Sequence, residues 1–467
     1  MRPYNFTFLR NGLLLTSLGI LGGSHFANSS QQPDIRRNTN SNPNFVILFV
    51  DDLGYYNVGF RNEKYYTPNI DRLKQQGVTF TNAYVPSPTC SPSRAGLYTG
   101  QHPARLQFYR HCLDNGQEYN VQNGDTSLLL SREWLPREVE TYAEVVKKKG
   151  YNTFFLGKWH LGNEKFGPQK QGFDTAWSNA GAGAVKSYYA PYFQGKGFWN
   201  DIPSNQYLTD FYTDKAVEYI QSYQEDQPFL LQFSYHNVHT PNVGRKDFLE
   251  MYKEKGFEGK MIEFGAQVSA MDASVGRIME ALEKSGKSNN TVVIFTSDQG
   301  SFFPNLPLRG TKQEGTTLYE GGQKVPFIMK WTGVIKEGGE IKSNVQTTDI
   351  FPTICEITGS NPKKYKGLEG LSLLSILKDD KPLDRSYIFA FRSYDAQYAS
   401  VLSKDNWKLI AYRDGRNELY KVDEDISEER NLAESNPQIT KTLLEALKNW
   451  EKGIGVYDLL QKYNGIK

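Results

Sequence analysis

The stretch "NFVILFVDD", residues 44–52, decides the fold of this chain. Its unbroken apolar run predicts a β-strand that is buried on both faces, which is typical of a parallel sheet covered by helices. A second run of the same shape, "TVVIFTSDQG" at 291–300, also ends in an acidic turn. Ligands of such sheets bind beyond the carboxyl ends of the strands. We therefore expect the functional site at these two ends.

Helical patterns alternate with short apolar runs between those two strands. The alternation is clear in "NIDRLKQQGVTF" at 69–80, in 138–162 and in 210–236. It predicts an α/β fold: a large mixed, mostly parallel, doubly wound sheet flanked by helices, over residues 44–384. From residue 385 the pattern changes to strand-like pieces followed by one helical stretch, "QITKTLLEALKNWEK". The segment 385–467 is thus expected to be a smaller C-terminal antiparallel α+β subdomain.

The N-terminal segment is typical of a secretory signal. Arg2 and Arg10 precede a short apolar run at 12–23, which is too short to cross a bilayer, and small and polar residues follow. We expect a signal peptide over 1–27 and a flexible polar linker over 28–43. The protein is then exported, periplasmic or secreted, and has no membrane span.

Charge and cysteine content exclude several function classes. The net charge is only +2, from 54 basic and 52 acidic residues, so no overall field directs the chain to nucleic acid or to a membrane surface. The three cysteines, Cys90, Cys112 and Cys355, are too few for a disulfide framework. Cys112 and Cys355 either pair or remain buried thiols.

The two strand ends carry a candidate metal site. Asp51 and Asp52 follow the first strand, and Asp298 and Gln299 follow the second. Carboxylate and amide oxygens from two such loops suit a hard cation such as calcium or magnesium. An aspartate at a strand end is more often a turn or cap residue, so each pair is informative mainly beside the other.

Basic side chains cluster after two further apolar runs. Lys158 and His160 lie two positions apart, on one side of the chain if the segment is extended, and His236 and His239 follow "PFLLQFS". Lys312 lies in a Gly-rich loop that could bring its ammonium inward, although alone it reads as a solvated lysine. Together with the acids they predict a site for an anion.

The segment "TCSPSRAGLYTG", residues 89–100, supplies a candidate nucleophile. It predicts a helix with Cys90 near its N-terminus, where anions are favoured, and with Arg94 one turn later. A thiol there would have a lowered pKa and could act as a nucleophile. A soft thiolate is nevertheless poorly matched to a hard cation.

This segment resembles the signature of the type I sulfatases of the alkaline phosphatase superfamily. The likeness continues in family order through "FVDDLGY", "GKWHLG", "VHTP", "SDQG" and "LRGTKQEGTTLYEGGQKVPF", over most of residues 44–467. Within that family the sequence resembles the bacterial polysaccharide sulfatases. The resemblance implies an alkaline phosphatase-like fold and the hydrolysis of sulfate esters.

The resemblance also implies roles for individual residues. A maturation enzyme would oxidise Cys90 to formylglycine, and one calcium ion would be held by the set Asp51, Asp52, Asp298, Gln299 and the modified Cys90. Gln299 stands where many relatives have asparagine, and its amide oxygen has a longer reach. Arg94 would stabilise the formylglycine hydrate, and Lys158 and His160 would hold hydrate and sulfate oxygens. His239 and Lys312 would protonate the leaving alcohol.

The chemistry of sulfate esters agrees with these implied roles. The ester keeps its charge at ordinary pH, so a metal and cations must neutralise its oxygens, and an acid must protonate the leaving oxygen. In the implied cycle one hydroxyl of the hydrate attacks sulfur, the alcohol leaves, and elimination of sulfate restores the aldehyde. Asp298 and His160 are both candidate proton acceptors. His236 has no implied role and is either structural or substrate-lining.

Two alternative functions are weaker. A two-metal phosphatase or phosphodiesterase of the same superfamily would need more His and Asp ligands than six histidines allow. A degenerate sulfatase that only binds sulfated glycan is disfavoured because every expected catalytic residue is present. Aromatic residues in 176–201 could stack on sugars, so a sulfated carbohydrate is favoured over a small aryl sulfate. The sequence leaves open the glycan, the sulfate position, exo or endo action and the oligomeric state.

Overall fold

The computed structural model describes residues 42–114, 116–121, 129–193 and 202–463. The predicted signal peptide, 1–27, lies outside the described residues, as does all of the predicted linker except its last two positions. The described residues belong to one compact unit, Asn42–Lys467. None of their helices is long and apolar enough to cross a membrane.

An eight-stranded mixed sheet forms the centre of this unit, in the order β11-β2-β10-β9-β1-β8-β6-β7. β1 pairs in parallel with β8 and β9, and β6 pairs in parallel with β8 and β7. β10 runs antiparallel to both β9 and β2. The predicted mixed, mostly parallel sheet is confirmed. The strands are β1 Asn44–Val50, β2 Val78–Phe80, β6 Asn152–Gly157, β7 Thr175–Trp177, β8 Phe229–Ser234, β9 Thr291–Ser297, β10 Phe327–Trp331 and β11 Gly339–Ile341.

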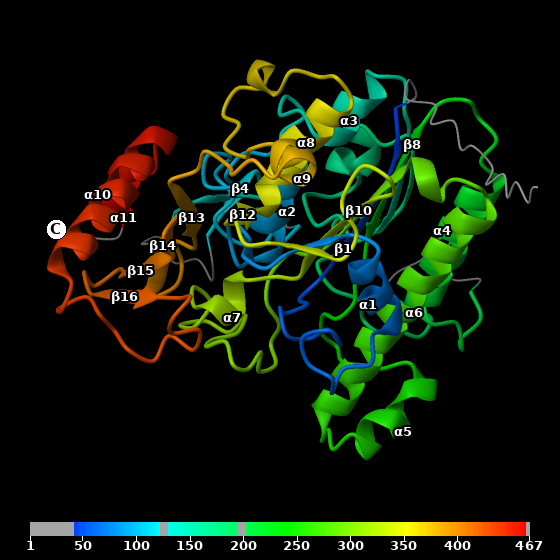
Figure 1. Ribbon diagram of the computed structural model, residues 1–467, viewed down its shortest axis with the longest axis horizontal. Helices are drawn as coiled ribbons and strands as arrows, with labels where there is room; N and C mark the ends of the chain where they lie inside the picture. Colours follow the sequence, from blue (N-terminus) through cyan, green and yellow to red (C-terminus); the bar gives the residue numbers. More distant parts are fainter. Residues whose placement is uncertain (1–41, 115, 122–128, 194–201, 464–467) are drawn as a thin grey trace, which may run out of the picture. The chain divides into compact units, whose positions relative to one another are not determined.

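Helices cover both faces of this sheet, as Figure 1 shows. Alternate side chains of β1 pack into two separate cores: Val46, Leu48 and Val50 into one, and Phe45, Ile47 and Phe49 into the other. This two-sided burial is what the unbroken apolar run predicts. The first core is closed by α1 Pro68–Gln75, α4 Leu208–Ser222 and α6 Lys260–Lys284; the second by α2 Cys90–Thr99, α3 Tyr142–Lys147, α8 Ile350–Ile357 and α9 Leu374–Asp379.

Shorter elements complete the main layer. The two-stranded pairs are β3 Ala83–Tyr84 with β12 Val345–Gln346, and β4 Tyr119–Asn120 with β5 Ser131–Arg132. The remaining helices are α5 Lys246–Glu254 and α7 Glu320–Gln323. Short 3₁₀ helices cover Glu164–Phe166, Pro168–Lys170, Ser288–Asn290, Thr347–Asp349 and Pro362–Lys364.

The C-terminal part is a four-stranded antiparallel sheet with helices, which confirms the predicted α+β character. Its strands, in spatial order, are β13 Tyr387–Phe391, β14 Gln397–Ser403, β15 Trp407–Tyr412 and β16 Asn417–Lys421. Two helices follow, α10 Pro437–Ile454 and α11 Tyr457–Tyr463. The expectation of a single helix was therefore wrong, because the αL residue Gly455 ends α10 and a second, separate helix begins two residues later. The domain boundary at 385 stays a prediction.

The C-terminal sheet is buried on both of its faces. Val401 and Leu409 pack against Leu443 and Leu447 of α10. On the opposite face, Ile388, Leu402 and Ile410 pack in one cluster with Leu318 and Tyr319, which immediately precede α7. The sheet therefore supports the loop that carries Lys312.

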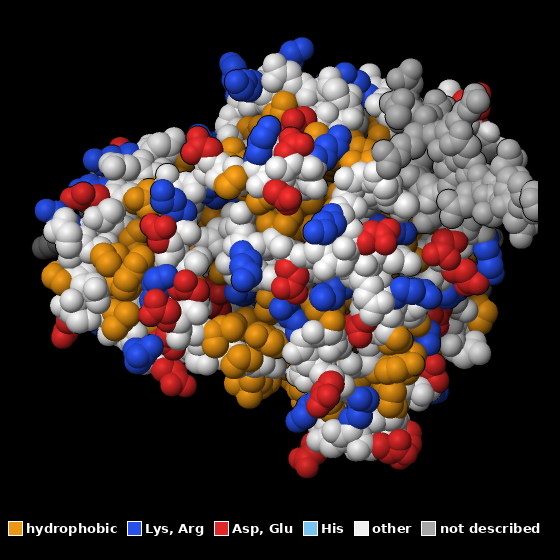
Figure 2. All heavy atoms as spheres, in the orientation of Figure 1, with side chains coloured by type: hydrophobic (Ala, Val, Ile, Leu, Met, Phe, Trp, Pro, Cys, Tyr) orange, Lys and Arg blue, Asp and Glu red, His pale blue; other side chains and the backbone are white. Residues whose placement is uncertain are grey.

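The face of the molecule in Figure 2 carries acidic and basic side chains of the described residues in an interspersed pattern. No large area of one sign is visible among them on that face. This distribution matches the near-zero net charge of the sequence.

Candidate active site

Four neighbouring strands end at the site. β9, β1, β8 and β6 are adjacent and parallel, so their carboxyl ends lie along one edge of the sheet. The polar residues predicted from the sequence follow these four strands in turn: Asp298 and Gln299 after β9, Asp51 and Asp52 after β1, His236 and His239 after β8, and Lys158 and His160 after β6. The topology thus brings together residues that are up to 248 positions apart, Asp51 and Gln299.

Three carboxylates converge at this edge. Asp51, Asp52 and Asp298 are each at most 1% exposed. Asp52 has φ 63°, a left-handed conformation that aspartate tolerates better than most residues. Its backbone N–H donates to Asp298 Oδ1 at 3.0 Å. This turn lets two consecutive aspartates face one centre, which a regular strand would forbid.

Each carboxylate has a cation beside it, and of these Arg94 and Lys158 are fully buried. Arg94 donates from Nη2 and Nε to Asp298 Oδ2, at 2.9 and 3.1 Å. Lys158 Nζ lies 2.6 Å from Asp51 Oδ2, and Lys312 Nζ lies 2.7 Å from Asp52 Oδ1. Burying so many charges is tolerated only because they are paired and hydrogen-bonded.

Cys90 is the first residue of α2 and lies in the middle of these groups. Its Sγ is 3.0 Å from Gln299 Nε2, 3.3 Å from Lys312 Nζ and 3.7 Å from Asp51 Oδ1. Burial would raise the pKa of the Cys90 thiol, but Lys158 and Lys312 outweigh it and hold that pKa well below its ordinary value. The chain therefore builds an environment that stabilises a negative charge at this position.

The aspartates respond differently to the same surroundings. Burial opposes ionisation of Asp51, yet Lys158 and the other cations hold its pKa well below the usual range. Burial, together with the charge of Asp51, raises the pKa of Asp298 well above its usual range despite Arg94. A cation bound between the two carboxylates would favour the ionised form of both.

The three predicted histidines have distinct surroundings. His160 has φ 56°, so the segment is not extended at this residue; its Nε2 is 3.1 Å from the Cys112 carbonyl oxygen. His239 Nδ1 donates to the Thr240 carbonyl oxygen at 2.7 Å, and its Nε2 is 3.8 Å from Asp52 Oδ2. His236 is 2% exposed and packs on Tyr212, and burial lowers its pKa well below the ordinary value. His236 is thus a packed side chain rather than part of the cavity wall.

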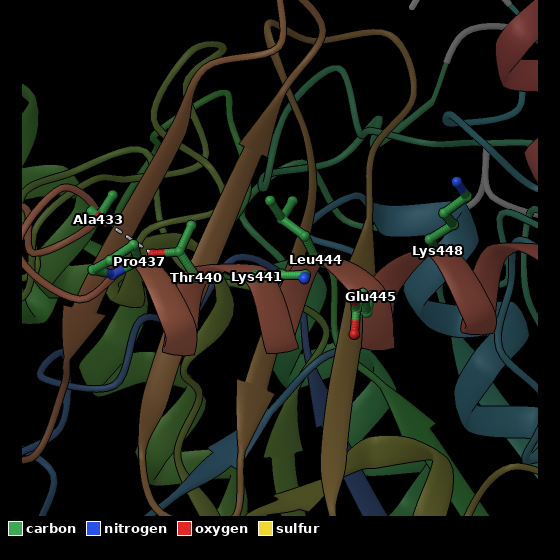
Figure 3. A pocket seen from close by; sticks show the side chains of 7 residues that line it. All are labelled: Ala433, Pro437, Thr440, Lys441, Leu444, Glu445 and Lys448. Atoms are coloured by element: carbon green, nitrogen blue, oxygen red, sulfur yellow. Dashed lines mark hydrogen bonds between the residues drawn. The ribbon is translucent and has the colours of Figure 1, made fainter.

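A cavity of about 750 Å³ opens directly onto Cys90, His160, His239 and Lys312. This volume suits a ligand of the size of a sugar unit. A second hollow, of about 320 Å³, runs along α10 (Figure 3). Its labelled side chains come only from α10 and the turn before it. None of the site residues predicted from the sequence lines this hollow.

The donors at the centre fit a hard divalent cation. Ligand atoms of Asp51, Asp52 and Cys90 lie within 4.8 Å of one another. Gln299 Oε1 is buried and has no hydrogen-bond partner among the residues that the structure describes. An orphaned amide oxygen next to three carboxylates is the donor set that Ca²⁺ prefers. Rotation of the Gln299 amide would turn this oxygen inward, because its two ends are interchangeable in shape.

Several residues of the cavity wall were not predicted from the sequence, and the most distant of them come from the C-terminal sheet. Arg392 and Tyr394 line the cavity from the turn between β13 and β14, about 300 positions after Cys90. No local sequence signal marks them, because their role depends on how the C-terminal sheet packs. The alternatives for the cysteines are also resolved: Cys90, Cys112 and Cys355 are all buried and free.

Cations, converging carboxylates and a buried thiol beside one cavity are the groups expected of an enzyme that acts on an anionic substrate. Residues 43–360 match the family model described as "Sulfatase", and residues 314–453 match "N-sulphoglucosamine sulphohydrolase, C-terminal". The first match covers more than half of the chain, so the chain belongs to the sulfatase family. It is a sulfuric ester hydrolase, and the resemblance to type I sulfatases is confirmed.

Relatives and solved structures extend this likeness over most of the chain. N-acetylgalactosamine-6-sulfatase of Mus musculus is 32% identical over 408 residues, 81% of this chain and 72% of its own length. A sulfatase of Formosa agariphila is 28% identical and covers 88% of both chains. The structure of Ps i-CgsB in complex with k-i-k-neocarrahexaose has 26% identity and a TM-score of 0.77, over 88% of this chain and 93% of that chain.

Proposed function

We propose that this sulfatase removes sulfate from a sulfated carbohydrate, with a formylglycine made from Cys90 and one calcium ion. The observation that carries the proposal is the position of Cys90. Its Sγ lies at the N-terminus of α2, 3.3 Å from Lys312 Nζ, and faces the 750 Å³ cavity. A side chain so placed can attack a sulfur atom bound in the cavity.

The formylglycine hydrate would supply a second hydroxyl, through which sulfate can leave without attack by water. In this chain Cys90 Sγ stands in for the attacking oxygen. Arg94 is held rigidly by Asp298 and by a hydrogen bond from its Nη1 to the Lys158 carbonyl oxygen at 2.9 Å. Its fixed charge, together with the Lys158 ammonium, favours a deprotonated oxygen at position 90. A maturation enzyme that acts on the segment 89–100 is part of this proposal.

Asp51, Asp52, Asp298 and Gln299 would hold the calcium ion. When bound, the ion supplies charge neutralisation for an oxygen of the sulfate group. The orphaned Gln299 Oε1 supports this assignment, since a bound cation would satisfy it. Lys158 and His160 would then contact the remaining sulfate oxygens.

Protonation of the leaving alcohol is assigned to Lys312 and His239. Both line the cavity beside Cys90. Asp52 is the strongest favourable influence on Lys312 and raises the pKa of its ammonium, so Lys312 stays charged and can donate a hydrogen bond to the developing alkoxide. His239 already donates from Nδ1, so the protonated ring would present a second donor from Nε2.

A carbohydrate substrate is supported by the cavity and by the names of similar proteins. The cavity size matches a sugar unit. One relative is named for N-acetylgalactosamine 6-sulfate, and one similar structure contains a neocarrahexaose. Export to the periplasm or medium, after removal of residues 1–27, would place the enzyme where such polymers occur.

The test is sulfate release from a panel of defined sulfated oligosaccharides by the protein produced together with a formylglycine-generating enzyme. We expect release that depends on calcium, and a tryptic peptide 75–94 whose mass shows the conversion of Cys90. Cys90→Ala is the matched control and should lower release by at least about 10³-fold, because the nucleophile is lost.

Two results would contradict parts of the proposal. Release from aryl sulfates alone would exclude the carbohydrate substrate. Full activity of a protein whose Cys90 remains an unmodified thiol would exclude the formylglycine. Phosphate release from phosphomonoesters at a higher kcat/KM than sulfate release would favour the phosphatase alternative instead.

A further inference from the structure

The C-terminal sheet contributes one wall of the catalytic cavity. The turn between β13 and β14, residues 392–396, places Arg392 and Tyr394 at the cavity beside Pro88, Thr89 and Cys90. Tyr394 Oη and Thr89 Oγ1 share a hydrogen bond of 3.1 Å. The turn is thus attached to the residue that directly precedes Cys90.

Arg392 is buried, but its guanidinium has few hydrogen-bond partners among the described residues. Its guanidinium makes one hydrogen bond, from Nη1 to the Pro88 carbonyl oxygen at 3.3 Å, and is only 5% exposed. Its Nε–H has no hydrogen-bond acceptor among the described residues. Buried guanidinium donors normally find acceptors, because an unpaired one costs the desolvation of the group.

Asp395 offsets only part of the Arg392 charge. Its Oδ2 is 3.6 Å from Arg392 Nε, which is beyond a good hydrogen bond. Both Asp395 oxygens instead accept the backbone N–H of Gly315, at 2.9 and 2.7 Å, and Oδ1 also accepts that of Ala396. The Tyr394 ring lies 4.6 Å from the guanidinium carbon and covers one of its faces.

The surroundings of Arg392 favour an anion over a neutral group. Lys312 and His239 line the same cavity, so its interior is basic around the nucleophile, while Glu314 is the carboxylate that lines it. The ester sulfate would occupy the end at Cys90. Arg392 lines the same cavity beside Pro88, so its guanidinium is placed to meet a different substituent of the same bound molecule.

We propose that Arg392 binds a second anionic substituent of the substrate, a carboxylate or a second sulfate, and so selects doubly charged sugar units. This proposal rests on the proposed function of the cavity. An arginine fork suits both anions, because it can donate two parallel hydrogen bonds to either. A neutral sugar in its place would leave the guanidinium with only Asp395 and the Pro88 carbonyl oxygen as partners.

The experiment compares kcat/KM for three related sugars: the best monosulfated substrate of the panel, its counterpart with one more sulfate, and its counterpart with a neighbouring uronate. We expect the unaltered enzyme to prefer at least one doubly charged sugar. In Arg392→Gln the ratio of kcat/KM between that sugar and the monosulfated one should fall about 10- to 100-fold, since a charge-assisted hydrogen bond contributes about 1.5–3 kcal/mol. The sugar whose preference is lost identifies the anion.

Two matched variants accompany this change. Arg392→Lys keeps the charge without the fork and should retain part of the preference. Lys404→Gln removes an exposed positive charge from the turn after β14, outside the cavity, and should leave the ratio unaltered. Thermal unfolding of each variant checks that it is folded.

An equal loss of kcat/KM on all three sugars would overturn the proposal, because it would make Arg392 a structural support for Pro88. So would an unaltered enzyme without any preference for the second charge. If no sulfate is released from any sugar, the proposed function fails separately. Binding of the three sugars to Cys90→Ala, with and without Arg392→Gln, then tests the role of Arg392. If each of the two proteins binds all three sugars with the same affinity, Arg392 does not select doubly charged sugars.

Discussion

Two of the buried charge clusters among the described residues differ in what they face. The active-site cluster comprises Asp51, Asp52, Asp298, Arg94, Lys158 and Lys312. The C-terminal cluster comprises Glu320, Lys324, Lys408 and Glu428, and joins α7 to the C-terminal sheet. All residues of both clusters are buried except Lys312, whose side chain is 12% exposed. Burial of charge therefore does not by itself distinguish a catalytic site.

The C-terminal cluster is closed. Lys408 Nζ lies 2.9 Å from Glu320 Oε1 and 3.0 Å from Glu428 Oε1, and Tyr84 donates to Glu320 Oε2 at 2.9 Å. Glu428 Oε2 accepts the backbone N–H of Glu320 at 2.7 Å. None of these side chains lines the catalytic cavity. The cluster fixes chain segments to one another.

The active-site cluster is open and incomplete. It borders the cavity, surrounds a thiol of lowered pKa and leaves Gln299 Oε1 without a partner among the described residues. Three carboxylates approach one another there, an arrangement that a bound cation would stabilise. The comparison indicates that convergent acids beside a cavity mark function, whereas mutually paired charges away from the cavity mark structure.

Breaking the C-terminal cluster should give the largest change in stability. Lys408→Met leaves Glu320 and Glu428 buried without their shared cation. We expect the free energy of unfolding, measured by urea denaturation, to fall by about 3–5 kcal/mol. The matched control Lys284→Met removes an exposed lysine that pairs with Glu280, and should cost no more than about 0.5 kcal/mol. A loss below about 1 kcal/mol in Lys408→Met would refute this view of the cluster.

The corresponding change in the active-site cluster should act on catalysis instead. Lys158→Met removes the cation that we propose stabilises the nucleophile and the sulfate oxygens, and kcat should fall about 10²- to 10³-fold. In calcium its cost in unfolding free energy should be smaller than that of Lys408→Met, because the bound ion would also neutralise Asp51. Steady-state sulfate release and urea denaturation in the same buffer measure both. Equal destabilisation by the two substitutions would remove the distinction between the clusters.

The response of stability to added calcium should also distinguish the two clusters. After chelation, adding calcium at about 100 times its dissociation constant should stabilise the protein by about 2.7 kcal/mol and restore activity. Thermal unfolding and sulfate release follow the two effects. Lys408→Met should keep this response, whereas Gln299→Leu should weaken it. An unfolding temperature that does not change with calcium would argue against the metal site.

The smallest expected effect is a pH dependence of the C-terminal cluster. Burial, with the charge of Glu320, raises the pKa of Glu428 from 4.5 to about 7 in the folded protein. The folded state then holds a proton that the unfolded chain has lost, so this contribution to stability is complete below pH 4.5 and is lost as the pH rises through about 7. The stability of the unaltered protein relative to Glu428→Gln should fall as the pH rises through this window. Urea denaturation at three pH values measures it; a difference that rises with pH would contradict the assignment.

The sequence alone predicted much of the fold. Apolar runs without alternation predicted the buried strands β1 and β9, because only strands covered on both faces bury every side chain. The positions of Asp51, Asp298 and Lys158 directly after such runs indicated a common edge of the sheet. The signature at 89–100 indicated the family, and local composition placed Cys90 near the N-terminus of a helix, as α2 confirms. The roles of the site residues stay predictions.

What only the tertiary structure decided are the distances between distant segments. The left-handed turn at Asp52, the free state of Cys112 and the entry of Arg392 into the cavity wall leave no local pattern in the chain. The same holds for the C-terminal cluster, whose members Glu320 and Lys408 read as ordinary surface charges in the sequence. Local composition determines which segments become strands and helices. The packing of those segments determines which charges meet, and therefore which buried cluster can do chemistry.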